Sequence, residues 1–321
     1  MNREDMRKLV VGAVATVPTP FNPNKNFAVD YGVMADMTRW WLENGLVKGK
    51  GVIKVAAFLG EGPQLREKEW EKLIDTVVKT AKGQAAIMAG IFHKDTVRTI
   101  EDAKRAQDLG VMGLQLTTPM FNDPTQDDLL RFYDDVNRAI NIGMLLYNVK
   151  WGRGTNTYGV ASVATMKKMV DMENFIAVKW SKQEGGKYED IFEIADKVNI
   201  IDNAGTPGLC YKLGGKGFVS MIADVYPPAG VKIVELLNAG KFEEAQQYHD
   251  TINAPFRDFY TKVNQRSGGQ ARMSKAMAEI MGHPVGPMRP PSLPLLDSEK
   301  REMREILVKL GWPVAKQAAL R

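Results

Sequence analysis

Two side chains, Lys179 and Tyr147, combine a residue type and a spacing that point to chemistry. Each lies near the end of a short apolar run that is typical of a buried strand, residues 175–180 and 143–148. A lysine in such a run costs free energy unless its amine is solvated, paired or used in a reaction. A desolvated lysine can form a Schiff base with a carbonyl substrate, and a phenol beside it can move protons.

Each of these residues also has a purely structural interpretation. Lys179 could bury its aliphatic stem and extend its amine to solvent at the end of the strand. Tyr147 could be a core tyrosine whose hydroxyl is hydrogen-bonded. The catalytic hypothesis therefore depends on the pair and on its spacing, which is about one strand–helix–strand unit.

The elements that must position this pair follow a regular alternation. Apolar runs without polar–apolar alternation indicate strands covered on both faces, as in a parallel sheet, at residues 10–18, 51–58, 85–92, 110–117, 143–148, 175–179, 198–202 and 217–222. Amphipathic segments predict helices between them at residues 31–45, 67–82, 96–109, 126–139, 160–172, 188–195 and 207–213. The pattern favours an α/β fold, a (β/α)8 TIM barrel. An open doubly wound sheet is the alternative, because a sequence cannot show closure.

The strand signals stop after residue 222. Helices are predicted from there on at residues 229–238, 242–264, 270–281 and 297–310, with a proline-rich connector at 286–291. We therefore expect a catalytic barrel over residues 1–226 and a C-terminal helical region over residues 227–321.

Composition and charge narrow the class of protein. The 321 residues are 44% hydrophobic and 25% charged, which is typical of a globular protein with a large core. The net charge is +5, but basic and acidic residues alternate along the predicted helices, so nucleic acid is not an expected partner. No apolar stretch reaches the roughly 18 residues of a membrane helix, and the N-terminus is not expected to be a signal peptide.

Cysteine and histidine usage excludes several kinds of site. Cys210 is the only cysteine, so no disulfide forms within the chain, which fits a reducing, cytoplasmic location. A buried, inert side chain is the favoured interpretation of Cys210. The histidines, His93, His249 and His283, are scattered, and no cluster has the spacing of metal ligands. We therefore predict no metal.

Further motifs lie where active residues of a parallel barrel gather, after the strands. They are Thr19-Pro20-Phe21, Gly60-Glu61, Thr118-Pro119 with Asn122 and Pro124, Tyr147-Asn148-Val149, Val178-Lys179, Gly214-Gly215-Lys216-Gly217 before Val219-Ser220, and Gly286-Pro287-Met288-Arg289-Pro290-Pro291. Together they resemble the dihydrodipicolinate synthase / N-acetylneuraminate lyase family of class I aldolases over about residues 11–310.

The resemblance implies a TIM barrel with a C-terminal helical region, usually a homotetramer, that acts on a small-molecule 2-oxo acid. It implies that Lys179 forms an imine with the C2 carbonyl of pyruvate or another 2-oxo acid, without a separate cofactor. Tyr147 would be the general acid and base and would bind the carboxylate side of the substrate. The substrate carboxylate would be held by the backbone N–H groups of Phe58 and Leu59, before Gly60, and the carbonyl of Val219 would line the site.

Departures from the family pattern argue against a typical dihydrodipicolinate synthase. Phe58 and Leu59 replace two hydroxyl residues, and Phe121 replaces a tyrosine, so a proton relay through hydroxyls is lost. Arg153 matches the arginine that binds the second substrate only if one residue is inserted. Ser181 would face the barrel interior if the strand continues, as a hydroxyl residue does in members that act on sugar acids.

The favoured function is a Schiff-base-forming lyase, an aldolase or hydratase-aldolase, acting on a pyruvate-derived 2-oxo acid. The apolar side chains Phe58, Leu59 and Phe121 suit an apolar or aromatic substituent, unless they only fill space. The alternatives are a dehydratase of 2-oxo-3-deoxy sugar acids, a dihydrodipicolinate synthase-like condensing enzyme, and a non-catalytic sensor that binds a 2-oxo acid.

Overall fold

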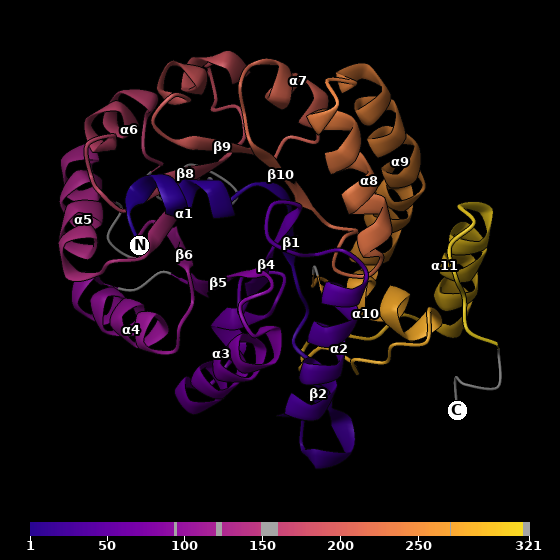
Figure 1. Ribbon diagram of the computed structural model, residues 1–321. Helices are drawn as coiled ribbons and strands as arrows, with labels where there is room; N and C mark the ends of the chain where they lie inside the picture. Colours follow the sequence, from indigo (N-terminus) through magenta and orange to yellow (C-terminus); the bar gives the residue numbers. More distant parts are fainter. Residues whose placement is uncertain (93–94, 120–123, 149–159, 270, 317–321) are drawn as a thin grey trace.

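The apolar runs of the sequence form a closed parallel barrel (Figure 1). The computed structural model describes residues 1–92, 95–119, 124–148, 160–269 and 271–316. Within these residues, eight parallel strands are hydrogen-bonded in the order β1-β10-β9-β8-β7-β6-β5-β4, and β1 pairs with both β10 and β4. The predicted TIM barrel with a C-terminal helical extension is confirmed, and the open doubly wound alternative is wrong.

Every strand of the barrel coincides with a predicted run. The strands are β1 (Gly12–Thr16), β4 (Gly51–Val55), β5 (Ala86–Ile91), β6 (Gly113–Thr117), β7 (Gly143–Tyr147), β8 (Phe175–Trp180), β9 (Asn199–Asp202) and β10 (Gly217–Ser220). Almost every residue in them is buried, because helices cover the outside and side chains fill the inside. The sequence did not indicate a short antiparallel hairpin, β2 (Phe21–Asn22) with β3 (Ala28–Val29), because two-residue strands have no measurable period.

The helices surround this barrel and continue beyond it. They are α1 (Arg3–Leu9), α2 (Tyr31–Glu43), α3 (Glu67–Ala81), α4 (Thr96–Asp108), α5 (Gln126–Ala139), α6 (Val163–Met169), α7 (Pro207–Lys212), α8 (Pro227–Asn238), α9 (Phe242–Arg266), α10 (Ala271–Ile280) and α11 (Asp297–Lys309). The predicted helix at residues 188–195 is instead a 3₁₀ helix, Tyr188–Ile194, after β8. A short segment with little apolar periodicity can adopt the tighter 3₁₀ hydrogen-bonding pattern instead of an α-helix.

Polar side chains just before several of these helices cap their first turns. The carboxylate of Asp30 accepts from the backbone N–H of Val33 in α2, and that of Asp95 accepts from Arg98 in α4. Thr125 does the same for α5 and Ser162 for α6. Each cap satisfies an N–H group that has no partner within its helix, so the strand-to-helix turns are defined by the local sequence.

Helix α1 closes the amino-terminal end of the barrel, which the sequence did not predict. In Figure 1 it lies across the opening that the strands surround. Met6 of α1 packs with Val14, Val52 and Leu145 in the barrel interior. The guanidinium of Arg3 donates to the backbone carbonyls of residues 170, 175 and 197. Among the described residues, α1 therefore packs against the interior at this end of the barrel.

The C-terminal region packs on one side of the barrel. Helix α8 packs on β1, where Gly230 lies so near Ala223 and Ala13 that a Cβ atom on it would come within 2.7 Å of the Ala223 Cβ. Helix α8 is thus the eighth helix of the barrel, and α9 packs on α7 and α8. We propose on this packing that the barrel extends to Asn238, rather than to residue 226, and that the helical region begins after it.

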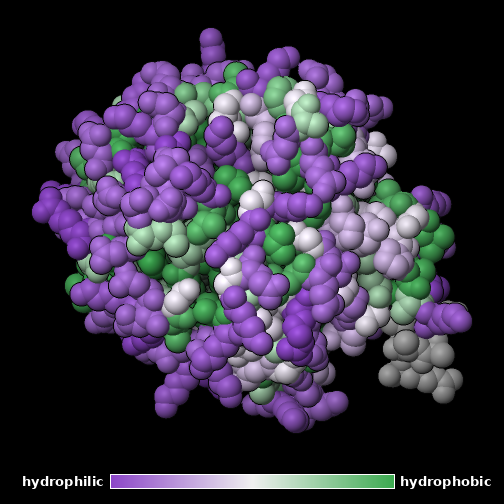
Figure 2. Space-filling view, viewed as in Figure 1, coloured by the Kyte–Doolittle hydropathy of each residue, from purple (hydrophilic) through white to green (hydrophobic). Residues whose placement is uncertain are grey.

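The surface in Figure 2 is mostly hydrophilic, with apolar side chains near α11 at the right-hand edge. Large apolar residues exposed in this region include Leu293, Leu296 and Val308. Among the described helices, none combines the length and the apolar character that crossing a bilayer requires. Cys210 is fully buried, and burial raises the pKa of its thiol to about 12, as its interpretation as an inert side chain requires.

A buried carboxyl group after β10 predicts an unusual pH dependence of stability. Asp224 is 0% exposed, and burial raises its pKa to about 7, against the opposing effect of the Ser274 hydroxyl. The folded protein therefore binds a proton that the unfolded chain releases above about pH 4, so folding stability falls as the pH rises towards 7.

We expect Asp224→Asn to remove this penalty, because the amide is neutral at every pH. Urea unfolding should give a free energy of unfolding that is ~2–4 kcal/mol higher than wild type at pH 8 and nearly unchanged at pH 4.5. The exposed Asp258→Asn is the matched control and should follow the wild-type curve. A variant that is less stable than wild type at pH 8 would contradict this assignment.

Candidate active site

A cavity opens at the carboxyl ends of the strands, where the packed interior stops. Its volume is about 400 Å³. Strand residues that line it include Thr16 of β1, Lys54 of β4, Gln115 of β6, Tyr147 of β7 and Lys179 of β8. Residues of the loops after β4, β9 and β10 and of α9 complete the wall. The C-terminal region therefore contributes directly to the site.

Tyr147 and Lys179 lie side by side in this cavity. They are register partners on the neighbouring strands β7 and β8, so both side chains project from the same level of the barrel. The Lys179 Nζ atom lies 3.6 Å from the centroid of the Tyr147 ring. Both residues are buried, with exposed fractions of 8% for Lys179 and 9% for Tyr147. The arrangement excludes the interpretation in which the Lys179 amine extends freely into solvent.

Burial sets the protonation of this pair. Desolvation, reinforced by the positive charge of Lys54, holds the pKa of Lys179 well below its ordinary value. Desolvation also raises the pKa of Tyr147 to about 12. The Lys179 amine therefore loses its proton more readily than an ordinary lysine, as a nucleophile requires. The phenol of Tyr147 keeps its proton at neutral pH and can donate it.

Lys54 and Gln115 were missed by the sequence analysis. Lys54 is 1% exposed, and its Nζ atom donates to the Gln115 side-chain oxygen at 2.6 Å. The signal was present, because Lys54 is a lone lysine inside an apolar run, as Lys179 is. What the sequence could not show is that both runs face the same interior.

The loop after β4 is a strained, tightly packed turn. Ala56 and Glu61 have left-handed backbones, with φ values of 50° and 59°, and they flank the turn. The N–H of Gly62 donates to the Ala57 carbonyl, and a Cβ atom at position 62 would lie 1.8 Å from the Ala56 carbonyl oxygen. Non-glycine residues with φ > 0 cost free energy and concentrate at functional sites. The turn presents Phe58 and Leu59 to the cavity.

A buried ion pair holds this loop in place from the C-terminal region. The Glu61 carboxylate lies 2.6 Å from the Lys275 amine of α10, and both side chains are almost completely buried. Burial raises the pKa of Glu61 and lowers the pKa of Lys275, and the attraction between the two opposes both shifts. Nearby, the hydroxyl of Thr19 donates to the Gly60 carbonyl. The loop is therefore tied both to the segment after β1 and to α10.

The cavity lining contains both apolar and polar residues. The apolar residues include Phe58, which is 38% exposed, Leu59 and Val219, together with Ile233 of α8 and Ile252 of α9. The polar residues of the loop after β9 and of α9 are Asn203, His249, Asp250, Asn253 and Arg257. The sequence analysis missed these polar residues, because nothing in the α9 sequence shows which face meets the barrel.

The loop that carries Asn203 is shaped by Asp202, the last residue of β9. The Asp202 carboxylate accepts from the backbone N–H groups of residues 204, 205 and 206 and from the Tyr188 hydroxyl. Ser181 lies beyond the end of β8, exchanges hydrogen bonds with Asn203, and is not among the residues that line the cavity. The condition for a position in the barrel interior, that the strand continues, is not met because β8 ends at Trp180, and a role of Ser181 in substrate binding stays a prediction.

Of the remaining predicted site residues, Val219 and Gly60 are described by the structure, and Phe121 and Arg153 are not. Val219 lines the cavity, whereas Gly60 supports the loop behind it. Phe121 and Arg153 lie outside the described residues, so their roles stay predictions. Among the residues that the structure describes, no group of three or more His, Cys, Asp or Glu side chains could hold a metal ion.

Comparisons with known proteins decide the family. The model of the dihydrodipicolinate synthetase family matches residues 9–310. The chain belongs to this family.

Relatives and solved structures agree with the assignment to this family. A 4-hydroxy-tetrahydrodipicolinate synthase of Methanococcus maripaludis (strain C6) is 30% identical over 94% of this chain and 98% of its own length. The crystal structure of a dihydrodipicolinate synthase has a TM-score of 0.78 at 26% identity and covers 94% of this chain and 99% of its own. That of the Aquifex aeolicus synthase has a TM-score of 0.81 at 24% identity, covering 95% and 100%. The expected family is confirmed, and with it an enzyme of the lysine Schiff-base, aldolase-type lyase class.

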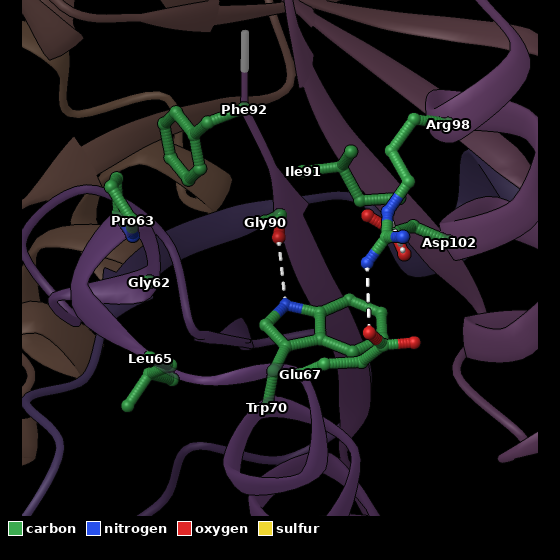
Figure 3. A pocket seen from close by; sticks show the side chains of 10 residues that line it. All are labelled: Gly62, Pro63, Leu65, Glu67, Trp70, Gly90, Ile91, Phe92, Arg98 and Asp102. Carbon is green, nitrogen blue, oxygen red and sulfur yellow. Dashed lines mark hydrogen bonds and ion pairs between the residues drawn. The ribbon is translucent and has the colours of Figure 1, made fainter. Parts of the chain in front are cut away.

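This family member has a second cavity beside the β4 loop, of about 320 Å³ (Figure 3). The indole N–H of Trp70 donates to the Gly90 carbonyl across it, and Arg98 forms an ion pair with Glu67. Phe92 lines this cavity, and its ring contacts that of Phe58, which lines the first one, at a centroid distance of 6.0 Å. The two aromatic rings thus stand between the cavities, and Lys179 and Tyr147 belong to the first.

The ion pair under the β4 loop should be required for stability. We expect Lys275→Met to lower the free energy of unfolding by about 3 kcal/mol, because it leaves the Glu61 carboxylate buried without its partner. Urea unfolding at pH 7 measures this. The control is Lys300→Met, which breaks a partly exposed pair with Glu279 and should cost less than about 1 kcal/mol.

The double variant Glu61→Gln/Lys275→Met should recover part of the loss, because no charge is then left unpaired. If Lys275→Met and Lys300→Met lowered the free energy of unfolding equally, the buried pair would not hold the loop.

Proposed function

We propose that this protein is a Schiff-base-forming lyase that acts on a 2-oxo acid derived from pyruvate. Lys179 would be the amine that forms the imine, and Tyr147 the general acid and base. The observation that carries the proposal is the position of the Lys179 Nζ atom, buried and 3.6 Å from the centroid of the Tyr147 ring. The substrate itself supplies the electrophile, so the proposal needs no metal or separate cofactor.

The chemistry follows from this pair. The Lys179 nitrogen attacks C2 of the 2-oxo acid, and the carbonyl oxygen takes up protons and leaves as water, which gives a protonated imine. The imine withdraws electrons from C3. When the C3–C4 bond breaks, its electron pair is stored as an enamine, and C4 leaves as an aldehyde after its hydroxyl loses a proton. Protonation of C3 and hydrolysis then release pyruvate and restore the amine.

Tyr147 fits the proton transfers in this sequence. Because its pKa is raised to about 12, the phenol is protonated at neutral pH and can donate to the departing oxygen. Its phenolate, once formed, is a strong base that can take the proton back. The hydroxyl relay of a dihydrodipicolinate synthase is incomplete here, because Phe58 and Leu59 have no hydroxyl groups. We therefore favour cleavage of a 2-oxo acid over the synthase activity that the relatives' names give.

The apolar residues of the cavity lining favour an apolar or aromatic substituent on the substrate. Phe58 is partly exposed at the mouth, where a ring or chain of the substrate would remove it from water. The polar residues of the lining support a second candidate, a 2-oxo-3-deoxy sugar acid dehydratase, because Asn203, Asp250 and Asn253 could bind hydroxyl groups. In that reaction the 2-oxo acid would lose water without carbon–carbon cleavage.

Assembly as a homotetramer and a cytoplasmic location remain part of the proposal. They rest on the family and on the sequence composition. Sedimentation of the purified protein would test the tetramer directly.

Borohydride trapping tests the proposed nucleophile. Incubation with pyruvate and borohydride should attach a reduced pyruvate adduct to the peptide that contains Lys179, detected by mass spectrometry. Lys179→Met should abolish the adduct, and the matched control Lys182→Met, an exposed lysine nearby, should keep it. A wild-type protein that gives no adduct at Lys179 with pyruvate or with larger 2-oxo acids would refute the proposal.

Product analysis separates the candidate reactions. Arylidene-pyruvates or their hydrates should yield an aldehyde and pyruvate if the apolar residues of the cavity lining bind the substrate's substituent. Turnover of sugar acids without pyruvate release would favour the dehydratase instead. Adduct formation without turnover over the whole panel would indicate a sensor.

A further inference from the structure

A second lysine occupies the floor of the proposed active site. Lys54 lies on β4, lines the same cavity as Lys179, and has an exposed fraction of 1%. Its Nζ atom donates to the side-chain oxygen of Gln115, 2.6 Å away on β6, the next strand but one in the barrel. A fully buried lysine is rare unless it is paired, so its presence here calls for an explanation.

The described residues around Lys54 offer no carboxylate to balance its charge. The titratable or charged side chains that line the cavity are Lys54, Tyr147, Lys179, His249, Asp250 and Arg257. Of these, the carboxylate of Asp250 is on α9 at the mouth, bonded to His249 and Gln246. Asp202 ends β9, the neighbour of the strand that carries Lys179. Its carboxylate accepts hydrogen bonds from Tyr188 and from the backbone of its own loop, and not from Lys54. The partner of Lys54 is thus the neutral amide of Gln115.

Two amines in one desolvated cavity cannot both hold a proton easily, because their charges repel. The Gln115 oxygen accepts a hydrogen bond from Lys54 and so favours an ammonium group there. Burial lowers the pKa of Lys54 to about 7, whereas burial and the charge of Lys54 together hold the pKa of Lys179 well below its ordinary value. The hydrogen bond to Gln115 therefore favours a proton on Lys54, and that charge disfavours a second proton on Lys179.

We propose that Lys54 is a positioning residue for the Schiff-base reaction: its ammonium group, held by Gln115 at the cavity floor, repels a second positive charge on Lys179 and keeps that amine free for attack. The inference rests on the proposed function, because it concerns the nucleophile of that reaction.

The pH dependence of imine formation tests the inference. In Lys54→Met the repulsion is lost, so the pKa of Lys179 rises and its amine becomes protonated at higher pH. The acid limb of the rate of borohydride trapping with pyruvate should move up by about one pH unit or more. At a pH on the acid limb of the wild type, trapping should slow about tenfold, and at alkaline pH it should return to the wild-type rate.

Two further variants separate charge from packing. Lys54→Arg keeps a positive charge and should keep the acid limb near its wild-type position. Gln115→Leu removes the acceptor but no amine, so the limb should move in the same direction as in Lys54→Met, by less. This second comparison keeps the test decisive if Lys54→Met does not fold, which circular dichroism and thermal unfolding would detect.

The outcomes distinguish the two proposals. If wild type is trapped at Lys179 and neither Lys54→Met nor Gln115→Leu moves the acid limb, the role of Lys54 is refuted and the proposed function stands. If wild type gives no adduct at any pH, both fail. An adduct on Lys54 in place of Lys179 would reverse the assignment of the two amines and refute the inference.

Discussion

The desolvation of one amine is the constraint on which the rest of this structure depends. The role proposed for Lys179 requires a site where water is scarce and a proton is unfavourable, and burial in the barrel favours both. Helix α1 packs against the apolar interior at the opposite end, and the amine lines the cavity at the carboxyl ends of the strands. The Tyr147 ring shields it from one side, 3.6 Å from ring centroid to Nζ. Lys54 adds a like charge from the floor.

The second requirement is a rigid loop at the mouth, and distant parts of the chain provide it. The turn between Ala56 and Glu61 contains left-handed backbone at both ends, which is stable only if its surroundings enforce it. The ion pair with Lys275 of α10 holds Glu61 in place, and the hydrogen bond from the Thr19 hydroxyl holds Gly60. The C-terminal helices thus support the site: α10 holds the β4 loop through Lys275, and α9 contributes polar residues to the cavity lining.

Much of the fold was predictable because its signals are local. Each barrel strand is a short apolar run, and residues such as Asp30 and Thr125 cap the helices that follow, so alternation alone indicated a barrel. Tyr147 and Lys179 were predictable as a pair because both end such runs. The errors lie where tertiary contacts decide: α1, the hairpin β2–β3 and the 3₁₀ helix Tyr188–Ile194 have little periodicity of their own.

The sequence by itself determined the order of strands and helices, the identity of the two residues proposed for catalysis, and the loss of hydroxyl groups at positions 58 and 59. Only the tertiary structure decided that Lys54 faces Gln115 in the same cavity, that α9 contributes polar residues to it, and that Ser181 contacts Asn203 instead. The reason is physical. Strand and helix formation depend on neighbouring residues, whereas the charge balance of a buried cavity depends on side chains brought together by closure of the barrel.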